Sequence, residues 1–180
     1  PGDGGYIQVS KNYGGKNTWL SKLDATGDRQ WQKAYGGTGW SWANSIQQTG
    51  DGGYILSGII NEPYGWGEYG DGWVVKLDDQ GAIQWQKTYK VGTLGVDIES
   101  IRQTADGGYI FLATVTTPAY ISSYVRYDTW VVKLDAAGSI LWQKLYNYSQ
   151  WEMPKAILET DDGGYLAAVI VRQANADFDT

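Results

Sequence analysis

Hydrophobic and polar residues alternate with a period of two along short segments of this chain. In residues 71–89, Trp73, Val75 and Leu77 alternate with Val74 and Lys76, and a second alternating run follows from Ile83 to Tyr89. This period is typical of β-strands. The residues between the two runs, Asp78-Asp-Gln-Gly81, suit a type I turn, in which the aspartate caps backbone amides and the glycine tolerates a positive φ. The segment is therefore predicted to be a β-hairpin.

The same segment recurs at 17–35 and 128–146, and its copies lie about 55 residues apart. A second motif, Asp-Gly-Gly-Tyr, begins at Asp3, Asp51, Asp106 and Asp162, between the copies. It predicts another hairpin, with strands near 45–49 and 54–60 in the second repeat. Two hairpins per repeat give four antiparallel strands, which is the composition of one blade of a β-propeller.

The expected fold is an all-β open arc of about three to four propeller blades. Its predicted parts are a partial blade at 1–37, whole blades at 38–92 and 93–149, and a partial blade at 150–180. First strands are expected near 43–49, 98–104 and 155–160, and thirteen strands in all. The first part lacks a first strand and the last lacks its third and fourth strands. We therefore expect further blades or neighbouring copies of the chain to cover both ends.

The composition disfavours several classes of function. The 180 residues contain 14 Lys and Arg against 20 Asp and Glu, with no Cys and no His. A net charge of −6 disfavours nucleic acid and anionic membranes as partners. The longest apolar run, residues 165–171, is too short for membrane insertion. Without a signal peptide or an initiator Met, the chain is expected to be a mature or excised piece.

One motif carries a family resemblance. Leu-Asp-x-x-Gly-x-x-x-Trp, at 23–31, 77–85 and 134–142, resembles the tryptophan-docking motif of quinoprotein-type (PQQ-like) propellers. Together with Thr-x-Asp-Gly-Gly-Tyr it is similar to tandem propeller repeats of secreted and cell-surface proteins of bacteria and archaea. The resemblance implies the fold and an extracellular or cell-surface location, whereas function varies widely among propellers.

The aromatic residues of the repeat are interpreted as core residues, because a residue that recurs in every blade is what packing one blade on the next requires. They are Trp19, Trp31, Trp73, Trp85, Trp130, Trp142, Tyr6, Tyr54, Tyr109 and Tyr165. The repeat aspartates Asp24, Asp78 and Asp135 are interpreted as turn caps rather than metal ligands. Neither a metal nor a cofactor is expected.

The remaining Trp and Tyr residues lie in or beside connections that emerge on one face of the disc. They are Tyr13, Trp40, Trp42, Tyr64, Trp66, Tyr69, Tyr120, Tyr124, Tyr127, Tyr148 and Trp151. All except Tyr13 and Tyr127 form the candidate partner-binding set, because loops on a rigid frame commonly carry binding. Glu62, Glu68, Asp97 and Glu152 are candidate polar contacts there. The alternative is that these loops fold over their own blades.

The sequence favours a non-enzymatic segment of an extracellular, cell-surface or fibre-forming protein that acts in adhesion or assembly. Its candidate partners are the remaining blades, neighbouring copies that form a filament, and a glycan. Asn147-Tyr148-Ser149 is an N-glycosylation sequence on the aromatic face. The alternatives are a carbohydrate-binding or glycan-processing propeller, a quinoprotein-like enzyme fragment and a periplasmic or intracellular assembly scaffold. Vicinal cysteines, a calcium constellation and a distinctive acid pair are missing from the sequence, which disfavours the enzymes.

Overall fold

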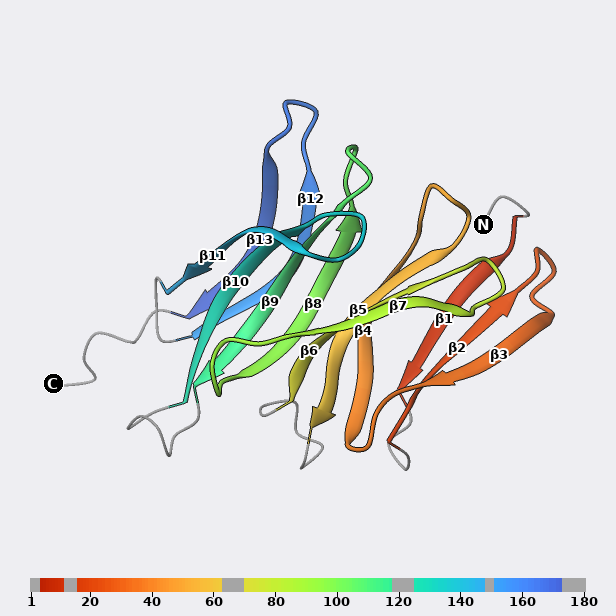
Figure 1. Cartoon of the computed structure of the whole chain (residues 1–180), viewed down its shortest axis with the longest axis horizontal. Helices are drawn as coiled ribbons and strands as arrows, with labels where there is room; N and C mark the ends of the chain where they lie inside the picture. The colour runs from red at the N-terminus through yellow and green to blue at the C-terminus, as the bar shows by residue number, and fades with distance from the viewer. Residues whose placement is uncertain (1–3, 12–15, 63–69, 118–124, 148–150, 173–180) are drawn as a thin grey trace, which may run out of the picture.

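The computed structural model describes residues 4–11, 16–62, 70–117, 125–147 and 151–172. These residues form thirteen β-strands and no helix (Figure 1). The strands are β1 (Tyr6–Lys11), β2 (Thr18–Leu23), β3 (Arg29–Tyr35), β4 (Trp40–Gln48), β5 (Tyr54–Glu62), β6 (Asp71–Leu77), β7 (Ile83–Tyr89), β8 (Gly95–Gln103), β9 (Tyr109–Thr117), β10 (Arg126–Leu134), β11 (Ile140–Tyr146), β12 (Trp151–Glu159) and β13 (Tyr165–Arg172). The all-β prediction is confirmed.

The strands pair with their neighbours in sequence and form four antiparallel units. The first unit is β1-β2-β3, the second β4-β5-β6-β7, the third β8-β9-β10-β11 and the fourth the hairpin β12-β13. A single parallel contact between Tyr127 and Trp151 joins β10 to β12, so the third and fourth units count as one six-stranded sheet. The units follow one another in a row from the N-terminal to the C-terminal end (Figure 1).

The turns have the predicted chemistry. The Gly81 amide donates to the Asp78 carbonyl at 3.1 Å, and the Asp78 carboxylate accepts from the amides of Gln80 and Ala82. Gly81 has a φ of 74°, which is in the left-handed region that favours glycine. Asp24 and Asp135 cap the equivalent turns. Their interpretation as turn caps is confirmed.

The first strands start earlier than predicted. β4, β8 and β12 begin at residues 40, 95 and 151 rather than 43, 98 and 155. In the second and third units the second strand is also longer than predicted, and Trp40 lies opposite Glu62 and Gly95 opposite Thr116. In the fourth unit β13 ends at Arg172 as predicted, and Trp151 lies opposite Arg172. Extended backbone on one strand supplies hydrogen-bond partners for the other.

Apolar clusters lie between successive units. One joins Leu20 and Tyr35 of the first unit to Trp73 of the second, and another joins Val74 of the second to Trp130 of the third. A smaller cluster joins Ile110, Leu112 and Val131 of the third unit to Ile157 of the fourth. The core therefore consists of interfaces between neighbouring sheets, whereas β11 of the third sheet is mostly exposed.

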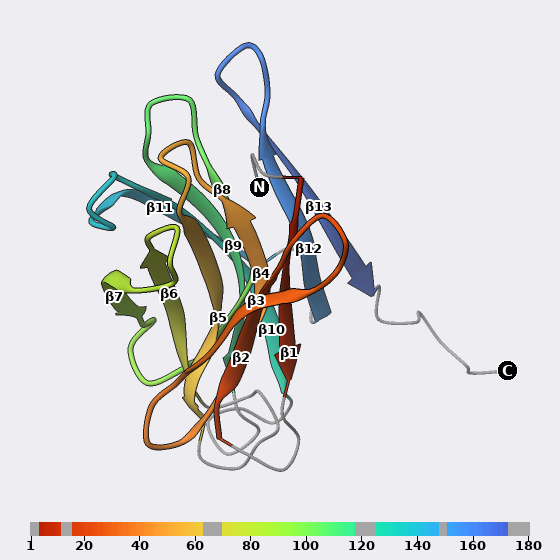
Figure 2. The same cartoon turned by 90° about the vertical axis from the view of Figure 1, so that its right-hand side faces the viewer.

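The repeat aromatics are buried only where a neighbouring unit covers them. Trp73, Trp130, Tyr54 and Tyr109 are buried, as predicted, and Trp31, Trp85 and Tyr165 are partly buried. The prediction is wrong for Tyr6, which is 62% exposed, and for Trp19, which is 36% exposed, both in the first unit, and for Trp142 on β11, which is 37% exposed. No described unit lies against the outer side of β1 and β2, which stand at the end of the row that faces the viewer in Figure 2.

We expect Trp73→Ala to destabilise the chain much more than Trp19→Ala, although the two residues occupy the same repeat position. Trp73 fills an interface and is 1% exposed, so its removal should lower the free energy of unfolding by about 3–5 kcal/mol. Trp19 faces away from the second unit and should cost far less. Urea denaturation followed by circular dichroism measures both, and equal losses would contradict the assignment of the core to the interfaces.

Candidate functional site

The Asp-Gly-Gly turn holds a buried lysine from the third strand of the same unit. The Lys76 Nζ donates to both carboxylate oxygens of Asp51, at 3.1 and 2.8 Å, and to the Leu77 carbonyl at 3.0 Å. Lys133 and Asp106 repeat this contact in the third unit. The side chain of each lysine is only 5% exposed. The contact therefore ties the third strand to the turn between the first and second strands.

The second glycine of the turn provides the space for this lysine. A Cβ atom on Gly53 would lie 2.8 Å from the Lys76 Nζ and 2.2 Å from the Leu77 carbonyl oxygen. Gly108 is confined in the same way by Lys133 and Leu134. Sequence reasoning missed this contact. The signal was the lysine three positions after the repeat tryptophan, at 22, 76 and 133.

The aspartates of these turns are held in their charged form. Burial alone would raise the pKa of Asp51, but hydrogen bonds from Lys76, Thr49 and the Gly53 amide lower it to about 2. Hydrogen bonds from Lys133, Thr104 and the Gly108 amide hold the pKa of Asp106 well below its usual range.

In the first and second units, the fourth strand holds the Asp-x-x-Gly turn of the following unit. The Tyr35 hydroxyl donates to the Gly81 carbonyl at 2.7 Å, and the Tyr89 hydroxyl donates to the Gly138 carbonyl at 2.8 Å. Lys33 Nζ reaches the Gln80 carbonyl at 2.8 Å. A Cβ on Gly81 would lie 3.0 Å from the Trp31 ring, so the turn glycine also allows a close approach. Burial, with a smaller contribution from Asp78, raises the pKa of Tyr35 to about 12.

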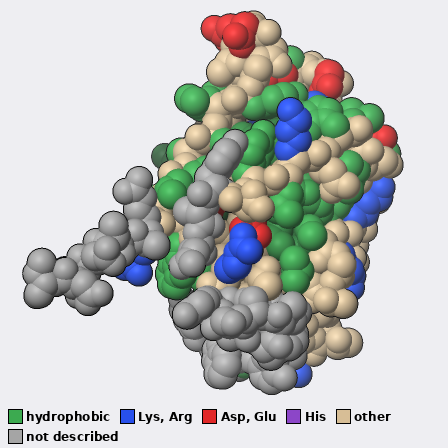
Figure 3. All heavy atoms as spheres, turned by 90° about the vertical axis from the view of Figure 1, so that its left-hand side faces the viewer, with side chains coloured by type: hydrophobic (Ala, Val, Ile, Leu, Met, Phe, Trp, Pro, Cys, Tyr) green, Lys and Arg blue, Asp and Glu red, His purple; other side chains and the backbone are tan. Residues whose placement is uncertain are grey.

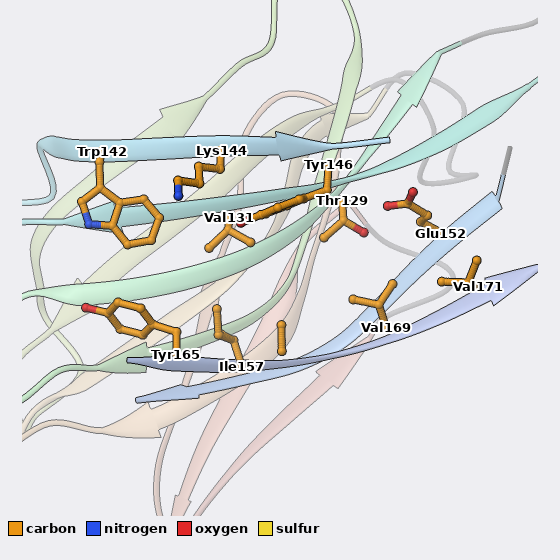
Figure 4. A pocket seen from close by; sticks show the side chains of 11 residues that line it. Thr129, Val131, Trp142, Lys144, Tyr146, Glu152, Ile157, Tyr165, Val169 and Val171 are labelled. Carbon is orange, nitrogen blue, oxygen red and sulfur yellow. The ribbon is translucent and has the colours of Figure 1, made fainter. Parts of the chain in front are cut away.

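A groove of about 680 Å³ lies between β10–β11 and the hairpin β12–β13 (Figure 4). Figure 4 shows Trp142, Lys144 and Tyr146 along β11 on one side, and Tyr165, Ile157 and Val169 on the hairpin across from them. The groove is lined by Thr129, Val131, Trp142, Lys144, Tyr146, Glu152, Ile157, Tyr165, Ala167, Val169 and Val171. Its wall is mainly apolar, and its Trp and Tyr residues occupy the repeat positions of Trp85, Tyr89 and Tyr54, which are buried or partly buried in the second unit.

The opposite side of β12–β13 is also apolar and exposed. Side chains alternate along β13, so Leu166 and Ile170 point away from the groove. With Met153 and Leu158 of β12 they form a patch that we call the C-terminal face; each of the four is more than 40% exposed. Figure 3 shows hydrophobic side chains spread over this end of the molecule. Tyr6 and Trp19, which we call the N-terminal face, are the exposed aromatics at the other end.

Only part of the candidate partner-binding set lies in the described residues. Trp40 and Trp42 are partly buried in β4, and Trp151 is partly buried at the start of β12. Trp40 and Trp151 each precede the threonine of their Asp-Gly-Gly turn by nine positions and thus share one edge of the row. Asn147 is exposed. Tyr64, Trp66, Tyr69, Tyr120, Tyr124 and Tyr148 lie outside the described residues.

Trp151 is at the centre of a small aromatic and cationic group. Its ring packs edge-to-face on Tyr127 with centroids 4.9 Å apart, and the Arg172 guanidinium lies 5.3 Å from the Trp151 ring centre. Trp151 and Arg172, with Met153 and Ile170, line a second hollow of about 390 Å³.

The candidate acids are in different environments. Glu152 is buried in the wall of the groove, and Asp128 is buried nearby. Burial raises the pKa of Asp128; Arg126 opposes this rise and Glu152 adds to it. Asp97 accepts from Asn44 at 2.6 Å, and Asp71 pairs with Lys90 at 2.8 Å. Within the described part of the chain, no three Asp or Glu residues converge as they would around a metal ion. Glu68 is not among the described residues, and nothing is described of the Glu62 side chain.

Comparison with known proteins shows a likeness of fold. No protein-family model matches the sequence, and no curated protein matches it. Among solved structures, the chain is similar to the crystal structure of a protein of unknown function from Bacteroides caccae, with a TM-score of 0.56 and 14% sequence identity. The match covers 91% of this chain and 50% of that one, so this chain spans about half the length of its neighbour. The described residues contain no helix suited to spanning a membrane.

The Lys76–Asp51 contact predicts acid sensitivity with a definite sign. The pKa of Asp51 is depressed in the folded state, so its contribution to stability is full above about 4, the pKa of an unfolded aspartate, and is lost as the pH falls toward about 2. We expect the free energy of unfolding to fall over this range. Asp51→Asn should flatten the fall, whereas Asp79→Asn, at an exposed turn position, should not. Urea titrations at a series of pH values measure both.

Proposed function

We propose that this chain is a segment of a β-propeller, an open arc of about three to four blades, that acts without catalysis in adhesion or assembly outside the cell or on its surface. Three features support the propeller arrangement. The whole units are four-stranded meanders, the first strands β4, β8 and β12 contact one another in order, and the fourth strands β3 and β7 each hold a turn of the next unit.

The observation that carries the assembly function is the apolar surface at the two ends of the row. The C-terminal face exposes Leu166 at 61% and Ile170 at 55%, and the N-terminal face exposes Tyr6 and Trp19. Contiguous exposed apolar surface is a marker of interaction. The two faces differ, and a contact between the front of one copy and the back of another is heterologous, so it generates rings or filaments.

The extracellular or cell-surface location has less support than the assembly function. It follows from the resemblance to tandem repeats of secreted proteins, and the exposed Asn147 is consistent with it. The alternative is a periplasmic or intracellular scaffold, in which the same end faces would serve assembly.

We expect residues 1–180 alone to associate rather than to sediment as a stable monomer at micromolar concentration. The double variant Leu166→Lys, Ile170→Lys should shift the distribution toward monomer, because it places two charges on the C-terminal face. Ile83→Lys is the matched control, since Ile83 is also exposed but lies on β7 in the middle of the row. Sedimentation velocity that finds a folded monomer for the unmodified chain would overturn the assembly function.

Glycan recognition is a second candidate function, favoured by the hollow beside Trp151. An aromatic ring with a neighbouring guanidinium offers a stacking surface and hydrogen-bond donors to a sugar. The hollow shares Met153 and Ile170 with the C-terminal face, so a bound glycan would compete with association.

We expect a glycan bound in this way to be lost in Trp151→Ala and retained in Trp40→Ala, its repeat equivalent away from the hollow. A glycan array followed by titration calorimetry on the two variants measures this difference. Equal loss in both variants would argue against the hollow as the binding site.

A further inference from the structure

We propose that the groove between β11 and β13 is an acceptor site for a β-hairpin that carries the chain's own third- and fourth-strand sequence and is donated by a further repeat. This inference rests on the proposed propeller function and names what fills the groove. Three independent features of the fourth unit specify the hairpin.

The first feature is a strand edge. In the first three units the second strand pairs with a third strand, as β1 does with β2, β5 with β6 and β9 with β10. β13 is the second strand of the fourth unit and pairs with β12 on one side. Among the described strands, none pairs with its other edge. Main-chain hydrogen bonding along such an edge is a common way to bind an extended segment.

The second feature is a turn prepared for a lysine. The Asp162 carboxylate accepts from the Thr160 hydroxyl and the Gly164 amide, as Asp51 and Asp106 do in their turns. A Cβ atom on Gly53 or Gly108 would collide with a lysine ammonium and a leucine carbonyl. At Gly164 the three nearest atoms belong to Thr160 and Asp162, and no described lysine lies as close as Lys76 and Lys133 do in their units. The fourth unit therefore has the Asp and Gly that receive the third-strand lysine in the other units.

The third feature is the set of side chains that grip a turn. Trp31, Lys33 and Tyr35 hold the turn at Gly81, and Trp85, Lys87 and Tyr89 hold the turn that contains Gly138. The equivalent residues of β11, Trp142, Lys144 and Tyr146, line the groove. Trp142 already packs on Tyr165, as Trp85 packs on Tyr109. The groove is thus shaped for an Asp-x-x-Gly turn with a lysine-bearing strand before it.

These features exclude a folded second copy as the donor. In a folded copy, the hairpins β2–β3, β6–β7 and β10–β11 already pair through their third strands with β1, β5 and β9. The occupant must be a hairpin whose third-strand edge is open. Its pattern is Trp-x-x-Lys-Leu-Asp-x-x-Gly-x-x-x-Trp, which the chain itself contains three times.

The test uses the full 180-residue chain and a fluorescein-labelled synthetic peptide with the sequence of residues 71–89. Fluorescence anisotropy measures binding, and hydrogen exchange read by mass spectrometry locates it. We expect saturable binding that slows amide exchange in residues 165–172. Lys76→Ala in the peptide should weaken binding at least about tenfold, because it leaves the acceptor carboxylate without its buried partner.

Variants of the chain test the same contact from the other side. Asp162→Ala should weaken binding as much as Lys76→Ala does in the peptide, and the two changes together should cost little more than either alone. Asp161→Ala, which alters the adjacent exposed carboxylate, is the matched control and should bind normally. Circular dichroism confirms that each variant is folded.

Three results would overturn the proposal: no binding with the peptide in large excess, equal binding of the Lys76→Ala peptide, or protection at an edge other than β13. The test is separate from that of the assembly function. A chain that is a monomer but binds the hairpin through Asp162 refutes assembly through the end faces and keeps the acceptor site. A chain that associates but ignores the hairpin does the reverse.

Discussion

The second and third units each depend on the contact made by the buried lysine of the third strand. Lys76 and Lys133 place an ammonium group where almost no water reaches it, and a buried charge is tolerated only with good hydrogen-bond partners. Asp51 or Asp106 and a backbone carbonyl supply those partners. Since the aspartate belongs to the turn between the first two strands, the contact fixes three strands relative to one another. It also explains why the turn needs both an aspartate and a second glycine.

Apolar side chains are buried between the units rather than within a single unit. A single sheet has two faces, and each becomes core only when a neighbour covers it. The stability of the row is therefore close to a sum over nearest-neighbour interfaces. The second and third units have a neighbour on each side. Among the described units, the first and fourth each have one neighbour, which is why equivalent residues such as Trp73 and Trp19 differ so strongly in exposure.

The local sequence predicted much of this arrangement, but it did not predict the features that depend on the position of a residue in the row. The period-two alternation located all thirteen strands, and Asp78 and Gly81 identified their turn, because both are determined by a few neighbouring residues. The early start of β4 was not predicted, since it depends on how far β5 extends on the other side of the hairpin. The exposure of Trp142 could not be predicted from the neighbouring sequence either. Trp85 has the same sequence context, but a different neighbouring unit lies beside it.

The candidate functional surfaces were likewise predicted only in part from the sequence. The sequence singled out Trp151 by subtracting the repeat, but the Arg172 that lies over its ring comes from another strand of the fourth unit, which alternation alone does not place there. The groove was not predicted as a site, although the prediction that the last blade lacks its third and fourth strands was the signal for it. Most of the aromatic face lies outside the described residues, so its role stays a prediction.

The tyrosine hydroxyl on the fourth strand has a consequence for the row as a whole. Tyr35 and Tyr89 donate toward the following unit's turn, and both contacts point from the N-terminal toward the C-terminal end. The row therefore has a direction, with hydroxyl donors on β3 and β7 and carbonyl acceptors in the turn of the unit that follows each. Two successive units therefore cannot exchange places in this contact, because the tyrosine donor of one needs the carbonyl acceptor of the next.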